Sequence, residues 1–300
     1  MGNYRMHPLY KKHTMDSAMS SVWEFYKKYF LILYATAFAM SIVLQYFSSL
    51  LNIEQLQSTT DFQVLIEKMR EMIVPIIGLS LISLFFTTVL QHFVLNKPVD
   101  EENNIFKSVI ISFKYFVPFL IIMILLTFFG VAAIAIGILL LVVGALFAAV
   151  YLLALYLFVL PVMMTEGINI GKILSRIFSL LHRNFWSNIG WSAVFLIMLL
   201  VISVIFSAII MIPFSGNIIG NVLNPGEAAP SYLTSPLFIL LSAAVNALTM
   251  PLLPIFAAVL YFNAKAGEDS VEEKINEPGE YRPTVEDLYS KPLDENLTEK

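Results

Sequence analysis

The stretch that decides the fold spans residues 115–165 and reads YFVPFLIIMILLTFFGVAAIAIGILLLVVGALFAAVYLLALYLFVLPVMMT. It contains no Asp, Glu, Lys or Arg. An ionised side chain at the centre of a bilayer is costly, so a charge-free run of this length predicts chain inside a membrane. As one helix, 51 residues would be more than twice as long as a roughly 30 Å hydrocarbon core. The run therefore predicts two spans, with Gly137 and Gly144 on either side of the turn.

Four further charge-free runs lie outside this stretch, at residues 29–53, 72–96, 184–226 and 228–264. Each is long enough for one transmembrane helix. The composition agrees, because 58% of the residues are hydrophobic and only 13% are charged, against roughly 25% charged in a soluble domain. The sequence thus predicts an all-α integral membrane protein with six spans, at about 29–51, 73–95, 115–137, 142–164, 188–213 and 237–262.

The basic residues predict the orientation of these spans. When loops are assigned alternately to the two sides, 16 of the 18 Lys and Arg residues fall on one side, and only Lys68 and Arg70 on the other. Lys and Arg collect in cytoplasmic loops. Both termini are therefore expected in the cytoplasm, with residues 1–28 as an N-terminal segment. The tail, residues 263–300, holds 11 acidic and 5 basic residues and is expected to be disordered.

An amphipathic stretch that ends in a basic and an aromatic residue precedes the first, third and fifth predicted spans. The clearest covers residues 166–187, where polar and apolar side chains alternate at helical spacing. Helices of this kind lie among lipid headgroups. We expect three repeats of an interfacial helix plus a transmembrane hairpin, with ordinary juxtamembrane composition as the alternative. The residues expected at the headgroups are Lys27, Lys28, Lys114, Lys172, Arg176, Arg183 and Trp186.

Residues 165–167, Thr-Glu-Gly, and residues 172–186, KILSRIFSLLHRNFW, carry a resemblance. They resemble the signature of bacterial six-span proteins similar to the membrane domain of glycerophosphoryl diester phosphodiesterases and the related YciC and DUF975 groups. The resemblance covers about residues 17–264 and implies a helical protein of the bacterial inner membrane, without implying an activity. In the phosphodiesterase relatives the chemistry belongs to a separate soluble barrel, and the 38 residues after position 262 are too few for one.

Residues that carry catalytic or metal chemistry are scarce. Cysteine is absent, and no two of the four histidines have the short helical spacing of a metal-binding pair. No ionisable side chain lies deep in a predicted span, which disfavours an ion-coupled transporter. We therefore expect no enzyme activity, no cofactor and no nucleic-acid partner.

The last predicted span contains the most polar intramembrane pattern, with Asn246 and Thr249 followed by Pro251 and Pro254. Two prolines remove two helix hydrogen bonds and free carbonyls near 247 and 250, which neighbouring helices, hydroxyls or water must satisfy. Broken helices line substrate cavities in transporters. A kinked helix that packs through the Asn amide is the alternative.

Two functions fit these observations. The first is a non-catalytic accessory or scaffold component of a membrane assembly, with lipids and membrane proteins as partners. It would act through its interfacial helices and its acidic tail, where the candidate docking residues are Tyr281, Leu288 and Tyr289. The alternative is a transporter or scramblase for lipids or other apolar molecules, which uses a cavity at the kinked sixth span.

Overall fold

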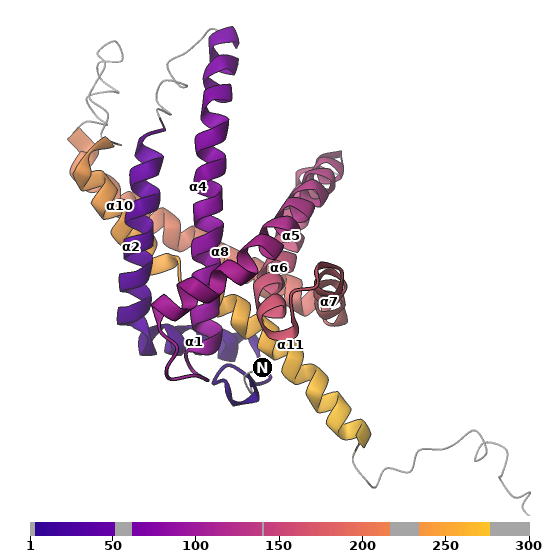
Figure 1. Ribbon diagram of the computed structural model, residues 1–300. Coiled ribbons are helices and arrows are strands. Elements are labelled where there is room, and N and C mark those ends of the chain that lie inside the picture. Colours follow the sequence, from indigo (N-terminus) through magenta and orange to yellow (C-terminus); the bar gives the residue numbers. More distant parts are fainter. Residues whose placement is uncertain (1–3, 52–61, 140, 217–233, 277–300) are drawn as a thin grey trace, which may run out of the picture.

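The computed structural model describes residues 4–51, 62–139, 141–216 and 234–276, and these residues form helices and no strand (Figure 1). Within these described residues, six helical segments are long and apolar enough to cross a membrane. The prediction of an all-α, six-span protein is confirmed. The segments are Phe30–Ser49, Phe62–Asn96, Ile105–Leu139, Val142–Glu166, Phe185–Phe214 and Pro236–Ser270.

The first two spans are helices α2 (Phe30–Ser49) and α4 (Phe62–Asn96). Helix α4 begins 11 residues before the predicted start of its span, because the amphipathic residues 62–72 continue the same helix. The start of α4 and the end of α2 lie at one end of the bundle (Figure 1). Helix α1 (Met15–Lys28) and the N-terminal segment lie at the other, which we call the basic end after its lysines and arginines.

The third and fourth spans form a tight hairpin of α5 (Ile105–Leu139) and α6 (Leu141–Glu166). Gly137 and Gly144 face each other across it. A Cβ atom built on Gly137 would lie 2.7 Å from the backbone carbonyl oxygen of Gly144. The prediction that these two glycines border the turn is confirmed, and the reason is close backbone approach.

Two of the three expected interfacial helices are separate elements, α1 and α7 (Ile170–Arg183). Thr14 caps α1 and Asn169 caps α7, each accepting a hydrogen bond from a backbone N–H of the first turn. The prediction of a separate interfacial helix before the third span is wrong. Helix α5 begins at Ile105, capped by Asn104, and runs through Lys114 and Tyr115 without a break. No capping residue or turn follows Lys114, so the amphipathic stretch and its span share one helix.

The fifth span is α8 (Phe185–Met211), followed by a short 3-10 turn, Ile212–Phe214. The sixth consists of two helices, α10 (Pro236–Thr249) and α11 (Leu252–Asn276), instead of one kinked helix over 237–262. Pro251 lacks the N–H that would continue α10. Helix α11 also extends to Asn276, so the prediction that disorder starts at residue 263 is wrong for 263–276.

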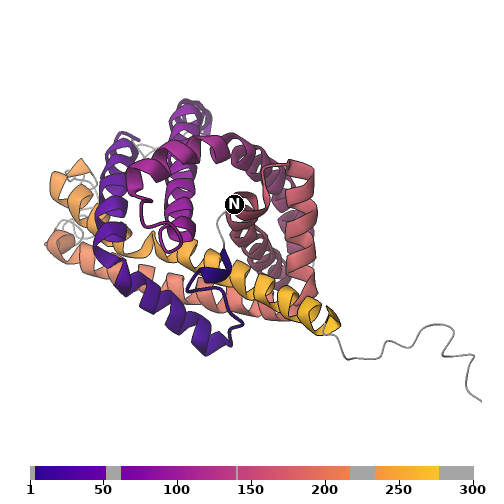
Figure 2. The ribbon, with the colours of Figure 1, turned by 60° about the horizontal axis from the view of Figure 1, so that its bottom comes forward.

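Helix α11 is the centre of the core. It packs against α1, α4 and α6, and its span is the most buried of the six. Figure 2 shows it crossing the bundle at the basic end, next to α1 and the N-terminal segment. The ring of His7 from that segment lies tilted against the ring of Phe262, with ring centroids 4.6 Å apart. Helix α11 therefore joins elements from both ends of the chain.

Candidate functional site

The break between α10 and α11 is held by side chains from two other helices. The Tyr26 hydroxyl of α1 donates a hydrogen bond to the carbonyl oxygen of Leu248, at 3.0 Å. The Gln91 amide of α4 donates to the carbonyl oxygen of Pro254, at 3.2 Å. Carbonyls around the two prolines are thus satisfied by neighbouring elements, as expected for a broken helix inside a bundle.

A cavity of about 240 Å³ lies against this break. Of the predicted kink residues, Thr249 and Pro254 line it, whereas Pro251 is buried away from it. Asn246 is exposed, and its backbone oxygen accepts a hydrogen bond from the Thr249 hydroxyl at 3.2 Å. The remaining lining residues come from the break, α4 and α8: Met250, Leu253, Ser83, Thr87, Leu90, Leu199 and Ser203.

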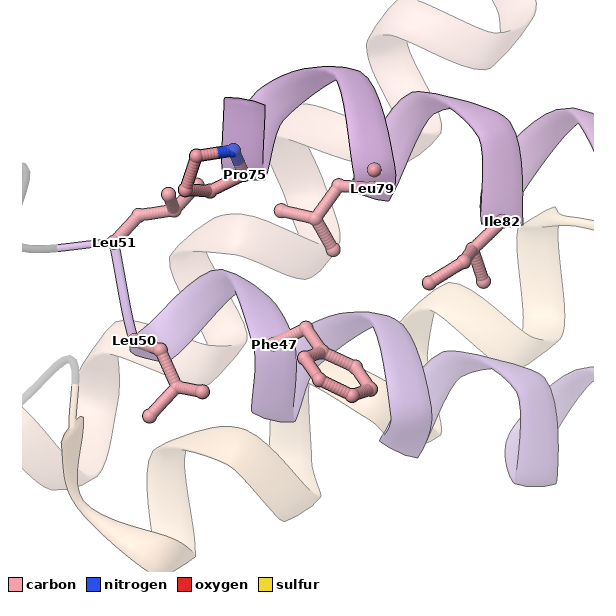
Figure 3. Close-up of a pocket in the computed structure, with 7 residues that line it drawn as sticks. Phe47, Leu50, Leu51, Pro75, Leu79 and Ile82 are labelled. Atoms are coloured by element: carbon pink, nitrogen blue, oxygen red, sulfur yellow. The ribbon is translucent and has the colours of Figure 1, made fainter. Parts of the chain in front are cut away.

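Two further cavities lie along α4, and each shares one lining residue with a neighbouring cavity. A cavity of about 510 Å³ between α2 and α4 includes Ser83, which also lines the cavity at the break. A cavity of about 310 Å³ adjoins it through Leu79, nearer the end opposite the basic end. In Figure 3 Phe47 of α2 faces Leu79 and Ile82 of α4 across this outer cavity. We call the three adjoining cavities the α4 groove.

The groove changes character along its length. Its outer cavity is lined by the apolar side chains of α2 and α4 together with Gly78. The next cavity adds Gln45, Ser48 and Ser80, and the cavity at the break adds more hydroxyls. None of the described residues that line it is charged. The groove is therefore amphipathic and neutral.

The groove ends before it reaches the basic end. Every residue of α4 from Thr88 to Leu95 is buried, including Gln91, whose amide donates to Pro254. Sequence reasoning missed the α4 residues of the groove. Ser80, Ser83 and Thr87 share one face of the helix, and this helical spacing of hydroxyl residues is the signal that could have identified them.

Arg176, expected at the lipid headgroups, pairs with carboxylates of its own chain. Its guanidinium donates to Glu166 at 2.8 Å and to both carboxylate oxygens of Glu268. Arg183 also pairs with Glu268, at 3.1 Å. The hydrogen bonds with Glu268 raise the pKa of Arg176 above its usual range. This cluster ties α7 and the end of α6 to α11.

The other predicted headgroup residues lie at exposed positions, and all of them except Lys114 are near a helix end. Lys27 lies over the ring of Trp23, Lys28 over Tyr29 and Lys114 over Tyr115, with 5.4–5.8 Å from each ammonium to the ring centroid. Trp186 is 77% exposed, and Lys172 is exposed on α7. Such pairs of a cation and an aromatic ring suit the headgroup region.

Two further points of the sequence analysis concern metal binding and the tail. Within the described residues, no group of three or more His, Asp or Glu side chains is placed to hold a metal ion. Tyr281, Leu288 and Tyr289 lie outside the described residues, and the docking role of the tail stays a prediction.

Comparison of the chain with models of protein families, with curated proteins and with solved structures finds no match. The resemblance to bacterial six-span proteins therefore stays a prediction.

Proposed function

We propose that this protein is a transporter or scramblase that moves a lipid, or another largely apolar molecule, along the α4 groove. The observation that carries the proposal is the hydroxyl-lined cavity at the broken sixth span, where Thr249 and Pro254 face Ser83 and Thr87 of α4. Broken helices next to cavities are the usual substrate sites of membrane transporters. The proposed membrane is the bacterial inner membrane, with the basic end in the cytoplasm.

The groove supports this function in a further way. Its outer cavity offers apolar side chains that suit hydrocarbon, and its inner cavity offers hydroxyls that suit a polar end. Toward the basic end, the α4 residues from Thr88 to Leu95 are buried.

The test is lipid movement by the full chain in liposomes. Fluorescent lipid analogues are placed in both leaflets, and an impermeant reductant bleaches those that reach the outer one. Replacing Pro251 and Pro254 together with Ala restores two backbone N–H donors and favours one continuous helix. We expect the rate to fall at least fivefold. Pro118→Ala, which removes a proline from α5, is the matched control. An unchanged rate in the double variant would contradict the proposal.

An accessory role in a membrane assembly is the second candidate, favoured by the fixed position of α11 beyond the spans. Glu268 and Asp269 of α11 are held by Arg176, Arg183 and Arg5, so the C-terminal part of α11 is fixed to the body. Removing residues 277–300 should then release a partner that the full chain retains in mild detergent, while lipid movement stays unchanged. A chain that purifies alone in both forms would contradict this role.

A further inference from the structure

Two hydroxyl groups stand between the cavity at the break and a second cavity. Thr87 of α4 lines the cavity at the break, and Tyr156 of α6 lines a cavity of about 380 Å³ between α5 and α6. The two hydroxyls share a hydrogen bond. Tyr156 is its donor, because Thr87 gives its own proton to the carbonyl oxygen of Ser83 at 2.9 Å. The bonded pair therefore forms a wall between the two cavities.

The second cavity, which we call the α5–α6 cavity, is apolar. Apart from Thr127 and Tyr156, it is lined by apolar side chains and Gly130. The Thr127 hydroxyl donates to the carbonyl oxygen of Met123 at 2.8 Å, so its proton is already used. An apolar cavity of about 150 Å³ stays dry and can bind a hydrocarbon as large as benzene. The larger α5–α6 cavity therefore suits a hydrocarbon occupant.

This cavity lies at the surface of two membrane-spanning segments. Val131, one of its lining residues, is 66% exposed, and Leu152 and Leu153 are half-buried. Exposed apolar side chains of a span meet lipid tails, which are as apolar as the side chains themselves. An acyl chain from the bilayer can therefore enter the α5–α6 cavity from the side.

The Tyr156 ring can move into the α5–α6 cavity, because it lines that space. Two contacts hold it in the observed position. One is the hydrogen bond to Thr87, and the other is the fully buried Phe119 ring, whose centroid lies 6.3 Å from that of Tyr156. Displacing the Tyr156 ring breaks one hydrogen bond and joins the α5–α6 cavity to the cavity at the break.

We infer that the α5–α6 cavity binds a hydrocarbon chain of a membrane lipid, and that Tyr156 is the positioning residue that keeps this chain out of the cavity at the break. The inference deepens the proposed function and rests on it in one respect. The α5–α6 cavity then serves as a lateral entry site, from which the lipid reaches the α4 groove when the Tyr156 ring moves aside.

The experiment uses the full chain in nanodiscs that contain a phosphatidylcholine with a photoreactive diazirine in the middle of one acyl chain. After irradiation, mass spectrometry measures the labelled fraction of each residue. We expect at least fivefold more labelling of Leu152 and Leu153 than of Ile197 and Val204, because a chain held in a cavity stays longer than a passing one. Ile197 and Val204 are exposed on α8 and line none of the cavities named above.

A filled cavity tests the site. Gly130→Leu adds a side chain that occupies the α5–α6 cavity, and it should lower the labelling of Leu153 at least fivefold. Gly190→Leu in α8 is the matched control, because nothing lies within 4 Å of a carbon added there. Equal labelling of Leu153 in the two variants would overturn the site.

Variants of Tyr156 test the wall. Tyr156→Ala removes the ring, so the bound chain should label Leu90, a buried residue of the cavity at the break, at least fivefold more than in the unaltered protein. Tyr156→Phe removes only the hydrogen bond and should raise this labelling about two- to tenfold. Tyr151→Ala is the matched control, because the Tyr151 ring packs near Phe129 and Phe185 and lines neither cavity.

The outcomes separate this inference from the proposed function. Labelling of Leu152 and Leu153 no stronger than that of α8 would overturn the site, even if the chain moves lipids in liposomes. Unchanged labelling of Leu90 in Tyr156→Ala would overturn the role of Tyr156. The expected labelling in a chain that moves no lipid would uphold the site and the wall but refute transport. The comparison within the unaltered chain keeps the test valid if a variant does not fold.

Discussion

The side-chain amide of Gln91 donates a hydrogen bond to the carbonyl oxygen of Pro254, 3.2 Å away. The two residues are 163 positions apart, and Gln91 is only 1% exposed. This bond joins α4 to α11 at the point where the α4 groove ends. Pro254 lies in the first turn of α11, directly after the break.

Replacing Gln91 with Leu should destabilise the protein. The side chain keeps its approximate size but loses its hydrogen bond to Pro254, and a typical intramolecular hydrogen bond contributes about 0.5–1.5 kcal/mol. Thermal unfolding in detergent is the measurement. Gln45→Leu is the control, because Gln45 is half-exposed in the groove. Equal melting temperatures for the two variants would show that the Gln91 bond contributes nothing to stability.

Replacing Arg176 with Met should detach α7 from α11. The variant leaves Glu166 and Glu268 without the guanidinium that binds both, and charge-assisted hydrogen bonds contribute about 1.5–3 kcal/mol each when well formed. The Arg176 side chain is 24% exposed, so we expect the lower part of this range. Protease cleavage within 165–185 should become faster. Lys172→Met, on the exposed face of α7, should leave cleavage unchanged.

The stability of the fold should depend on the protonation of His7. This ring is 2% exposed; its Nδ1 accepts from the Leu9 N–H at 3.1 Å, so Nε2 donates to the Val94 carbonyl oxygen at 3.1 Å. Burial lowers the pKa of His7 from 6.5 to about 4. The unfolded chain therefore binds a proton more readily between these values, and His7 contributes a loss of stability as the pH falls from 6.5 toward 4.

The pH dependence gives a direct measurement. Between pH 7.5 and pH 5 the His7 contribution should lower the free energy of unfolding by about 2 kcal/mol. His7→Gln should be less stable at pH 7.5 and should show a smaller decrease over this interval. His182→Gln, at an exposed position of α7, is the control. A His7→Gln variant that retains the full decrease would assign the pH dependence to other groups.

Replacing Gly137 with Ala should strain the hairpin of α5 and α6. Its Cβ would lie 2.7 Å from backbone atoms of Gly144, which cannot move as a flexible side chain does. We expect a loss of about 1–3 kcal/mol, as for other overpacked sites. Gly190→Ala in α8 is the control, since nothing lies within 4 Å of the added carbon. A stable Gly137→Ala variant would mean that the helices separate at little cost.

The sequence by itself determined the number of spans and much of their placement. Charge-free runs locate helices because ionised groups are expensive in hydrocarbon, and this rule needs no knowledge of neighbours. The turn at Gly137 and Gly144 was predicted from the length of the charge-free run 115–165. The interfacial helices α1 and α7 were predicted from the amphipathic spacing of the residues before Tyr29 and Asn184. These are local properties, so each can be read from a few dozen consecutive residues.

Only the tertiary structure decided where the polar groups go. Tyr26 and Leu248 are 222 positions apart, and Arg176 and Glu268 are 92 apart, yet each pair is bonded. Such contacts accompany the break in the sixth span and the extension of α11 to Asn276, and they pair Arg176 with carboxylates of its own chain. The α4 groove arises in the same way, because a cavity is the space that packed helices leave between them. No single helix encodes that space, so it was settled only when α2, α4, α8 and the broken last span packed together.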